Sequence, residues 1–146
     1  MNKIKLLTLT FFCLFSLLFT INALAETAKE YANHIVYYNA FPTDSLPPQM
    51  TKQYGLKRSK NYALINVSVM EKGAGTPTGV RSSVTGQVKN LMGQTRVLDF
   101  REIKEGKAVY YIAQVGVQGK EVVNFYLDIR PEGIKDNYEI KFSKKF

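Results

Sequence analysis

The stretch NYALINVSVME, residues 61–71, decides the fold of this chain. Its small and branched apolar residues recur at every second position, which places them on one face of an extended segment. They are Ala63, Ile65, Val67 and Val69. The opposite face carries Tyr62, Leu64, Asn66, Ser68 and Met70. Alternation with period two in a segment rich in Val and Ile predicts a half-buried β-strand.

Six further segments share this composition and alternation. They are His34–Phe41, Val80–Leu91, Thr95–Lys104, Ala108–Val117, Glu121–Arg130 and Tyr138–Phe146. Turn residues separate them, and links such as Met92-Gly93-Gln94 and Gln118-Gly119-Lys120 have the length of tight hairpin connections. Gly86, inside one of these segments, predicts a bulge or a close approach of two backbones.

One segment, Leu46–Gly55, departs from the β pattern. Its two prolines are tolerated in the first turn of a helix, and its final glycine is typical of a helix end. So short a helix is not stable alone. We therefore expect one or two helical turns after the first strand, packed against the rest of the chain by Leu46, Met50 and Tyr54.

About seven short strands at roughly ten-residue spacing predict an all-β fold, an antiparallel β-sandwich of immunoglobulin-like type. The alternative is an outer-membrane barrel, because aromatic residues such as Tyr138 and Phe142 alternate up to the final Phe146. Two observations favour the sandwich. Lys144 interrupts that alternation, and Ala108–Val117 is apolar on both faces, whereas a barrel strand turns one face to a polar lumen.

The first 25 residues have the three parts of a secretory signal peptide. Met1–Lys5 is basic, Leu6–Ile21 is apolar, and Ala23-Leu24-Ala25 offers small residues where a signal peptidase recognises them. The apolar run is shorter than the roughly 20 residues that a membrane anchor needs. We expect cleavage after Ala25, so that residues 26–146 form a single β-sandwich domain in the periplasm of a Gram-negative bacterium.

Removal of the signal peptide changes both the cysteine count and the charge. Cys13 is the only cysteine, so residues 26–146 have no disulfide, which fits a bacterial periplasm. Lys3 and Lys5 also leave, which reduces 20 basic residues to 18 against 12 acidic ones, a net charge of +6. A basic surface favours anionic partners. We expect an anionic envelope component or an unknown protein as partner, no nucleic acid, and no stable membrane insertion.

The sequence offers little for catalysis or metal binding. His34 is the only histidine, and one histidine cannot form a zinc site without cysteines or a carboxylate cluster. It opens a strand beside Glu26–Asn33, which we expect to be mobile, so we interpret it as a surface residue. Glu102 and Glu105 flank a turn, whereas a glycosidase needs two carboxylates facing each other across a cleft. We expect no catalytic residues, no metal and no cofactor.

Two groups of charged residues are candidate sites. Lys57, Arg58 and Lys60 form a basic turn that could bind a carboxylate or a phosphate. The alternative is a solvated turn, or one in which Arg58 pairs internally. Arg101 and Glu102 are neighbours in a predicted strand and therefore point to opposite faces. One of them must point inward and find a partner, which predicts a structural ion pair or hydrogen-bond network at these two residues.

Several segments resemble one protein family. They are Tyr38-Asn39-Ala40-Phe41, Leu46-Pro47-Pro48, Tyr54-Gly55-Leu56, Arg58-Ser59-Lys60-Asn61, Ala63–Val69, Asn90–Gln94, Arg101-Glu102-Ile103 and Tyr110-Tyr111-Ile112. In order and without a large gap, they are similar to the exported proteobacterial proteins grouped as domain of unknown function 4426. The resemblance implies a periplasmic β-sandwich of a Gram-negative bacterium. It supplies no function, because the family has no established activity or site.

The sequence therefore favours a soluble periplasmic interaction or accessory module that is not an enzyme. The alternative is a protein that binds a small ligand or an anion of the cell envelope through the turn at Arg58 and Lys60. A hydrolase that uses His34, Ser59 and Asp44 is a third hypothesis and has the least support.

Overall fold

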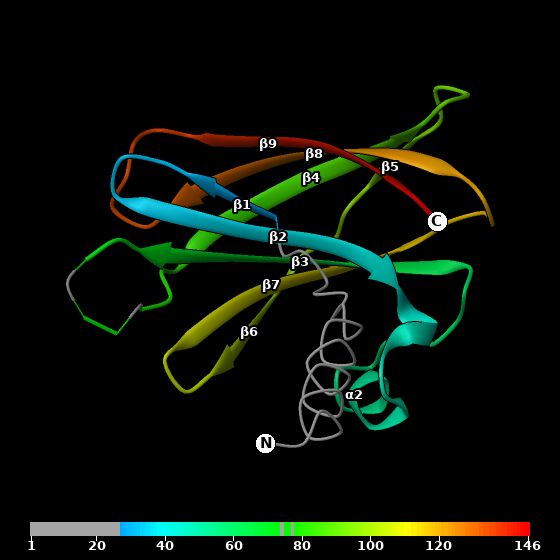
Figure 1. The fold of residues 1–146 in the computed structure, drawn as a ribbon, viewed down its shortest axis with the longest axis horizontal. Helices are drawn as coiled ribbons and strands as arrows, with labels where there is room; N and C mark the ends of the chain where they lie inside the picture. Colours follow the sequence, from blue (N-terminus) through cyan, green and yellow to red (C-terminus); the bar gives the residue numbers. More distant parts are fainter. Residues whose placement is uncertain (1–26, 74, 77) are drawn as a thin grey trace, which may run out of the picture.

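The computed structural model describes residues 27–73, 75–76 and 78–146, so the predicted signal peptide and its cleavage site lie outside the described residues. Two antiparallel sheets pack face to face, which confirms the predicted all-β sandwich (Figure 1). Sheet A has the order β1 (Thr27–Glu30), β2 (His34–Pro42), β3 (Tyr62–Glu71), β7 (Ala108–Gly116) and β6 (Arg101–Glu105). Sheet B has the order β5 (Thr95–Val97), β4 (Ser82–Asn90), β8 (Val122–Pro131) and β9 (Tyr138–Lys145). Within these residues, no helix has the length and apolarity needed to span a membrane.

The described residues contain nine strands rather than about seven. One additional strand arises because the predicted strand Thr95–Lys104 forms two strands, β5 and β6, which belong to different sheets. The chain crosses between the sheets at Leu98 and Phe100. Leu98 is buried and donates its N–H to Gly86 O at 2.9 Å, and Phe100 packs against the core. Leu98 and Phe100 are apolar residues two positions apart. The period-two pattern of a single strand therefore continues in the sequence although the chain leaves sheet B and enters sheet A here.

The other additional strand, β1, lies before the first predicted one and pairs with β2. After β1, Tyr31 stacks on Tyr138 with 3.8 Å between ring centroids and donates a hydrogen bond to Glu139 O at 2.9 Å. The expectation that Glu26–Asn33 is mobile is therefore wrong for the described residues 27–33. All four residues of β1 are exposed, so no apolar alternation marks this strand in the sequence.

His34 is buried at the start of β2, which corrects the expectation of a surface histidine. It is 6% exposed, and its Nδ1 lies 3.0 Å from the hydroxyl oxygen of Tyr138 in β9. The histidine occupies an inward position of β2, in alternation with Val36 and Tyr38. A buried polar ring needs a hydrogen-bond partner, and the tyrosine supplies one from the opposite sheet.

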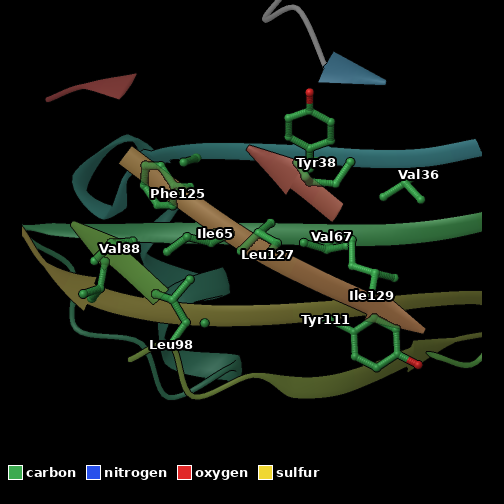
Figure 2. Close-up of a cluster of buried hydrophobic side chains, with 14 of the residues drawn as sticks. Val36, Tyr38, Ile65, Val67, Val88, Leu98, Tyr111, Phe125, Leu127 and Ile129 are labelled. Atoms are coloured by element: carbon green, nitrogen blue, oxygen red, sulfur yellow. The ribbon is translucent and has the colours of Figure 1, made fainter. Parts of the chain in front are cut away.

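The core lies between β3 of sheet A and β8 of sheet B. The inward residues of β3 are fully buried, as the alternation predicts, and those of β8 lie against them (Figure 2). From β3 these are Ala63, Ile65, Val67 and Val69, and from β8 they are Val123, Phe125, Leu127 and Ile129. Removal of this apolar surface from water is the main force that holds the two sheets together.

Gly86 of β4 is a point of close backbone approach, one of the two alternatives that its position predicts. A Cβ atom at this residue would lie 2.7 Å from Leu127 Cδ2 and 2.8 Å from Tyr126 O. The pairing of β4 with β8 continues through this residue without an extra residue on either strand, so the other alternative, a bulge, is absent at this position. Glycine is required here because no side chain fits.

The predicted short helix lies between β2 and β3, as a single turn η2 (Thr43–Ser45) followed by α2 (Pro48–Gln53). Leu46 is buried and Tyr54 is partly buried, as expected, whereas Met50 stays 41% exposed. The helix is therefore anchored mainly by the residues that flank it. It lies against the outer face of sheet A, the face turned away from the core.

Candidate functional site

The outer face of sheet A carries a second apolar cluster, separate from the core between the sheets. Leu64 of β3 and Ile112 of β7 are 5% and 7% exposed although both belong to this outer cluster. Phe41 lies opposite Leu64 in the pairing of β2 with β3, and Ile103 of β6 packs against the same cluster. An apolar face is stable in water only where another element covers it.

The α2 segment provides that cover, but incompletely. Leu46 before the helix is buried in the cluster, and Tyr54 and Leu56 after it pack against the cluster. Between them and the sheet lies a cavity of about 260 Å³, which we name the α2 pocket. It is lined by Phe41, Leu46, Met50, Tyr54, Leu56, Leu64, Asn66, Ile103, Glu105, Tyr110 and Ile112. This volume is below that of most drug-sized sites, so the pocket suits a molecule of one or two rings.

Asn66 is the amide side chain that sheet A contributes to the α2 pocket. It lies in β3 opposite Ile112 of β7, and its Oδ1 is buried without a hydrogen-bond partner. An unsatisfied buried acceptor costs about 1–3 kcal/mol and is uncommon in folded proteins. Asn39, its neighbour across β2, is satisfied because its Oδ1 accepts from the N–H of Ala40 at 2.8 Å. Asn66 therefore places a buried acceptor without a partner next to the α2 pocket.

Two contacts with β6 hold the end of α2 beside the pocket. The hydroxyl of Tyr54 donates to Glu105 Oε1, and Arg101 Nη2 donates to Tyr54 O at 2.6 Å. The hydrogen bond to Glu105 raises the pKa of Tyr54, because the carboxylate stabilises the protonated phenol that donates to it. Glu105 is also the single charged residue of the pocket lining.

A set of hydrogen bonds joins the residues before α2 to those after it and closes the loop that contains the helix. Thr43 is fully buried; its Oγ1 lies 2.7 Å from Lys57 O and accepts from the N–H of Ser59 at 3.0 Å. Gln114 of β7 donates from Nε2 to Lys57 O at 2.7 Å and accepts at Oε1 from the N–H of Lys57 at 3.0 Å. We name these contacts, together with those of Arg58 below, the α2 latch. They fix the pocket before any ligand is present.

The predicted basic turn of Lys57, Arg58 and Lys60 forms part of the α2 latch. Arg58 donates two hydrogen bonds to backbone carbonyls of the loop before α2, at 3.0 and 2.7 Å. Lys57 Nζ donates to the hydroxyl of Tyr62 at 3.2 Å and lies 4.9 Å from the centroid of that ring. Lys60 is exposed. The three side chains thus have different surroundings, and their binding of an anion stays a prediction.

Arg101 and Glu102 have separate partners, as expected for neighbours that point to opposite faces of a strand, and Glu102 belongs to a network of ion pairs and hydrogen bonds. Glu102 forms ion pairs with Arg81 and Lys104, both at 3.3 Å, and accepts from the Tyr111 hydroxyl at 3.0 Å. Burial acts to raise the pKa of Glu102, but these hydrogen bonds and charges outweigh it and lower the pKa. Adjacent side chains on a strand cannot meet because they project to opposite faces.

The structure keeps the residues of the hydrolase hypothesis apart. His34 begins β2 on its inward face, whereas the α2 pocket lies on the outer face near Phe41, about 23 Å further along an extended strand. Ser59 and the backbone of Asp44 belong to the region of the α2 latch. Among residues 27–73, 75–76 and 78–146, no group of three or more His, Cys, Asp or Glu side chains could hold a metal ion.

Sequence reasoning misses the α2 pocket, although two signals for it are present. Ala108–Val117 and His34–Phe41 are apolar on both faces, and the outer residues Ile112 and Phe41 contribute to the pocket. Asn66 is a second signal, since it is a polar residue within an otherwise apolar part of β3. Neither pattern indicates that a helix of six residues covers these positions.

The fold places the chain in a class of antiparallel sandwiches that includes FetP of uropathogenic Escherichia coli strain F11. The crystal structure of FetP expressed in the periplasm has 9% sequence identity and a TM-score of 0.58, and the match covers 84% of this chain and 93% of that one. A copper-bound FetP variant has 11% identity and a TM-score of 0.58, over 84% and 95% of the two chains. At this level of identity the likeness shows the fold.

Within that class, the chain belongs to the family described as Domain of unknown function (DUF4426), which matches residues 28–146. A DUF4426 family protein from Pseudomonas aeruginosa PAO1 has 32% sequence identity and a TM-score of 0.70, over 83% of this chain and 94% of that chain. No curated protein matches the chain significantly. The family resemblance inferred from the sequence is thereby confirmed.

Proposed function

We propose that this protein is a non-enzymatic binding module of the bacterial periplasm. In this proposal the α2 pocket holds a small, largely apolar molecule that carries an N–H or O–H donor. The observation that carries the proposal is the buried Oδ1 of Asn66, an acceptor without a partner in a pocket with apolar walls. Sites of this composition, mostly apolar with a few placed polar groups, are typical of small-molecule binding.

The rigidity of the α2 segment supports the same function. The α2 latch holds the chain on one side of the helix, and Arg101 and Glu105 hold Tyr54 on the other. A preformed site binds more tightly than a flexible one, because less conformational entropy is lost when the ligand enters. These contacts therefore favour a pocket that keeps its shape over a gap left by imperfect packing.

The chemistry of the pocket supports binding without catalysis. Its polar side chains are an amide, two phenols and the carboxylate of Glu105, which already accepts from Tyr54. Nucleophilic or general acid–base catalysis uses a nucleophile or proton carrier within hydrogen-bond reach of an activating partner. His34, the one histidine in the sequence, lies on another face of the sheet. Copper, found in a FetP variant, is not part of this proposal.

Indole and 1-methylindole provide a matched pair of probes for the α2 pocket. Both have the shape of a small fused ring, but only indole carries an N–H donor. Indole should bind with a Kd of about 0.01–1 mM, as expected for a ligand of this size, and shift the NMR signals of residues that line the pocket. The 1-methyl compound should bind about fivefold more weakly, because it leaves Asn66 Oδ1 without a partner.

Two variants test whether Asn66 causes this discrimination. Asn66→Leu should bind the two compounds equally, whereas Asn39→Ala, which changes the neighbouring asparagine outside the pocket, should preserve the preference for indole. The proposal is wrong if neither compound binds the folded protein, or if Asn66→Leu retains the preference.

A further inference from the structure

Large apolar residues are exposed on the hairpin formed by β4 and β5, at the opposite sheet from the α2 pocket. Leu91 and Met92 in its turn are 76% and 72% exposed, and Val97 in β5 is 81% exposed. Figure 1 shows that this hairpin projects away from the body of the sandwich. Among the described residues, Met50 is the one other large apolar residue that is exposed. Exposed apolar residues gathered on a projection indicate an interaction surface.

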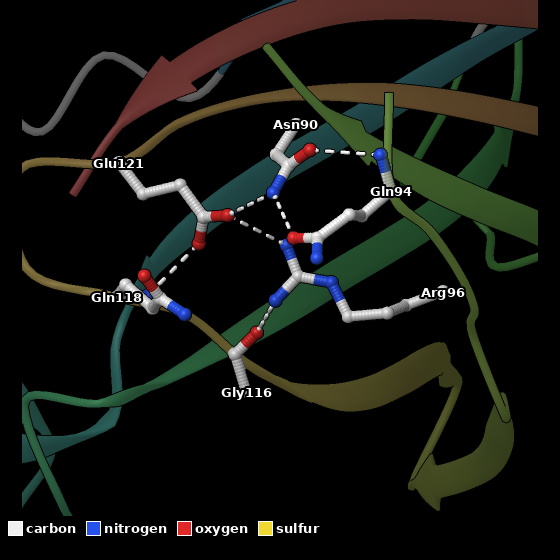
Figure 3. A network of polar contacts seen from close by, with 6 residues as sticks. All are labelled: Asn90, Gln94, Arg96, Gly116, Gln118 and Glu121. Carbon is white, nitrogen blue, oxygen red and sulfur yellow. Dashed lines mark hydrogen bonds and ion pairs between the residues drawn. The ribbon is translucent and has the colours of Figure 1, made fainter. Parts of the chain in front are cut away.

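A buried polar network holds the base of this hairpin (Figure 3). Asn90 is 4% exposed, and its Nδ2 donates to Gln94 Oε1 at 2.7 Å and to Glu121 Oε1 at 3.0 Å. Its Oδ1 accepts from the N–H of Gln94 at 2.9 Å. Glu121 also accepts from the N–H of Gln118 at 2.8 Å and pairs with Arg96 at 3.1 Å. The hairpin turn and the loop between β7 and β8 are thereby joined.

This network determines where the two apolar side chains point. The turn is closed by a hydrogen bond from the N–H of Gly93 to Asn90 O at 3.0 Å, and Gly93 has a φ of 82°, which favours glycine. The polar residues at the base of the turn are directed inward to Glu121. Leu91 and Met92 lie in this turn and stay exposed, and exposure of large apolar side chains to water has no advantage for folding alone.

Basic residues surround this apolar turn. They are Lys89, Lys120, Lys144 and Lys145, all of them exposed. Lys89 adjoins Asn90 in β4, and the two C-terminal lysines pair with the start of β8, which itself pairs with the end of β4. Lys120 lines the same hollow as Leu91 and Met92. The nearby acidic residue Glu121 has a side chain only 10% exposed and paired with Arg96, so it does not neutralise the lysines.

We propose that this end of sheet B binds the surface of an anionic lipid bilayer. Leu91 and Met92 enter the boundary between head groups and acyl chains, while the four lysines lie near the lipid phosphates. Apolar side chains flanked by basic ones have the chemistry of interfacial membrane binding, in which burial and attraction to anionic lipids add together. The excess positive charge of this end favours a lipid surface over an apolar protein partner without acidic groups.

Vesicle binding tests the proposal with the protein exported through its own N-terminal segment and purified. Vesicles of equal parts phosphatidylglycerol and phosphatidylcholine should sediment the protein at low salt, and vesicles of phosphatidylcholine alone should not. Leu91→Ser combined with Met92→Ser should weaken binding to the anionic vesicles at least about tenfold. Lys89→Gln and Lys120→Gln should each weaken it about fivefold, and salt near 1 M should release the wild-type protein.

Met50→Ser is the matched control for vesicle binding alone, because it removes an exposed apolar residue of the α2 pocket lining, away from the hairpin, and should leave vesicle binding unchanged. The variants of Leu91, Met92, Lys89 and Lys120 should keep the wild-type melting temperature and the affinity for indole, because none of these residues lines the α2 pocket. This result separates the proposal from that of the pocket. Equal sedimentation with both kinds of vesicle, no sedimentation with either, or full binding by the Leu91→Ser, Met92→Ser variant would each overturn the proposal.

Discussion

The outer faces of the two sheets differ in what covers them. In β8 of sheet B, buried inward residues alternate with outward residues that are half-buried or exposed. In β3 of sheet A, the inward residues before Glu71 at the end of the strand are buried, the outward residues Leu64 and Ser68 are buried as well, and the other outward residues are half-buried. The difference comes from α2 and its flanking residues, which cover one outer face only.

This difference shows how a binding pocket can arise on a simple sandwich. A helix of six residues with its flanking loops covers part of an apolar face and leaves a cavity beside itself. On sheet B, the outward positions of β4 such as Ser83, Thr85 and Gln87 are polar and exposed, so no covering element is needed there. A candidate site is thus expected where a strand carries apolar residues on its outward face as well as on its inward face.

The largest expected effect compares one outward residue from each sheet. Leu64→Ala should lower the free energy of unfolding by about 2–3 kcal/mol, because it removes a buried side chain beside an existing cavity. Gln87→Ala, at an exposed outward position, should change it by less than about 0.5 kcal/mol. Urea unfolding measures both. An equal change in the free energy of unfolding for the two variants would contradict the prediction that α2 and its flanking residues bury the outer face of sheet A.

A smaller effect of opposite sign is expected for Asn66→Leu. Replacing an unsatisfied buried acceptor by an apolar side chain should raise the free energy of unfolding by about 1 kcal/mol. Binding residues are commonly retained at a cost in stability. A thermal unfolding scan measures the change, with Asn39→Ala as the control; destabilisation by Asn66→Leu would show that the amide is needed for folding.

The basic turn should give a smaller effect still. Arg58→Ala removes two hydrogen bonds to backbone carbonyls and should lower the free energy of unfolding by roughly 0.5–1 kcal/mol. Lys60→Ala should leave it unchanged, because the exposed side chain is expected to be free in solvent. Chemical unfolding of the two variants makes the comparison. If instead both variants are stable and lose binding to anionic envelope material, the basic turn is an anion site.

The last prediction concerns the carboxylate of Glu121 at acid pH, and no change is expected at neutral pH. Burial acts to raise the pKa of Glu121, but hydrogen bonds from Gln118 and Asn90 and the charge of Arg96 outweigh it and lower the pKa below its usual value near 4.5. The stabilisation from this carboxylate is therefore complete above about pH 4.5 and is lost as the pH falls through the lowered pKa.

Acid should therefore loosen the base of the β4–β5 hairpin before it loosens the α2 latch, whose backbone and amide groups do not titrate. Hydrogen exchange at residues 90–94 and 57–59, measured near pH 6 and near pH 3, compares the two regions. Glu121→Gln should remove the difference in pH dependence. Equal loss of protection in both regions would contradict the prediction.

Much of the sandwich could be predicted from the sequence, because apolar inward residues recur at every second position of β3 and β8. β1 could not be predicted, since its four residues are exposed and pair with β2 through backbone groups that every sequence possesses. The crossing at Leu98 and Phe100 could not be predicted either. A period-two pattern indicates that a side chain is buried, but it does not indicate to which sheet the strand belongs.

The candidate site depends even more on contacts between distant residues. The sequence shows that Arg58 could pair internally, but its partners lie twelve and fourteen residues away and are carbonyls, which carry no sequence signal. His34 is expected at the surface because it begins a strand beside a segment that the sequence does not show to be packed, whereas Tyr138, more than one hundred residues later, makes its burial possible. The α2 pocket joins residues from β2, β3, β6 and β7, which only the fold brings together.

The edges of both sheets have a consequence for how these molecules behave when crowded. The edge strands β1 and β5 have four and three residues, and β6 (REIKE) is charged at four of its five positions. The remaining edge strand, β9, contains Lys141, Lys144 and Lys145. Short or charged edges offer a poor template for another strand. The protein should therefore resist stacking edge to edge into fibrous aggregates, and each copy keeps its own surfaces free at high local concentration.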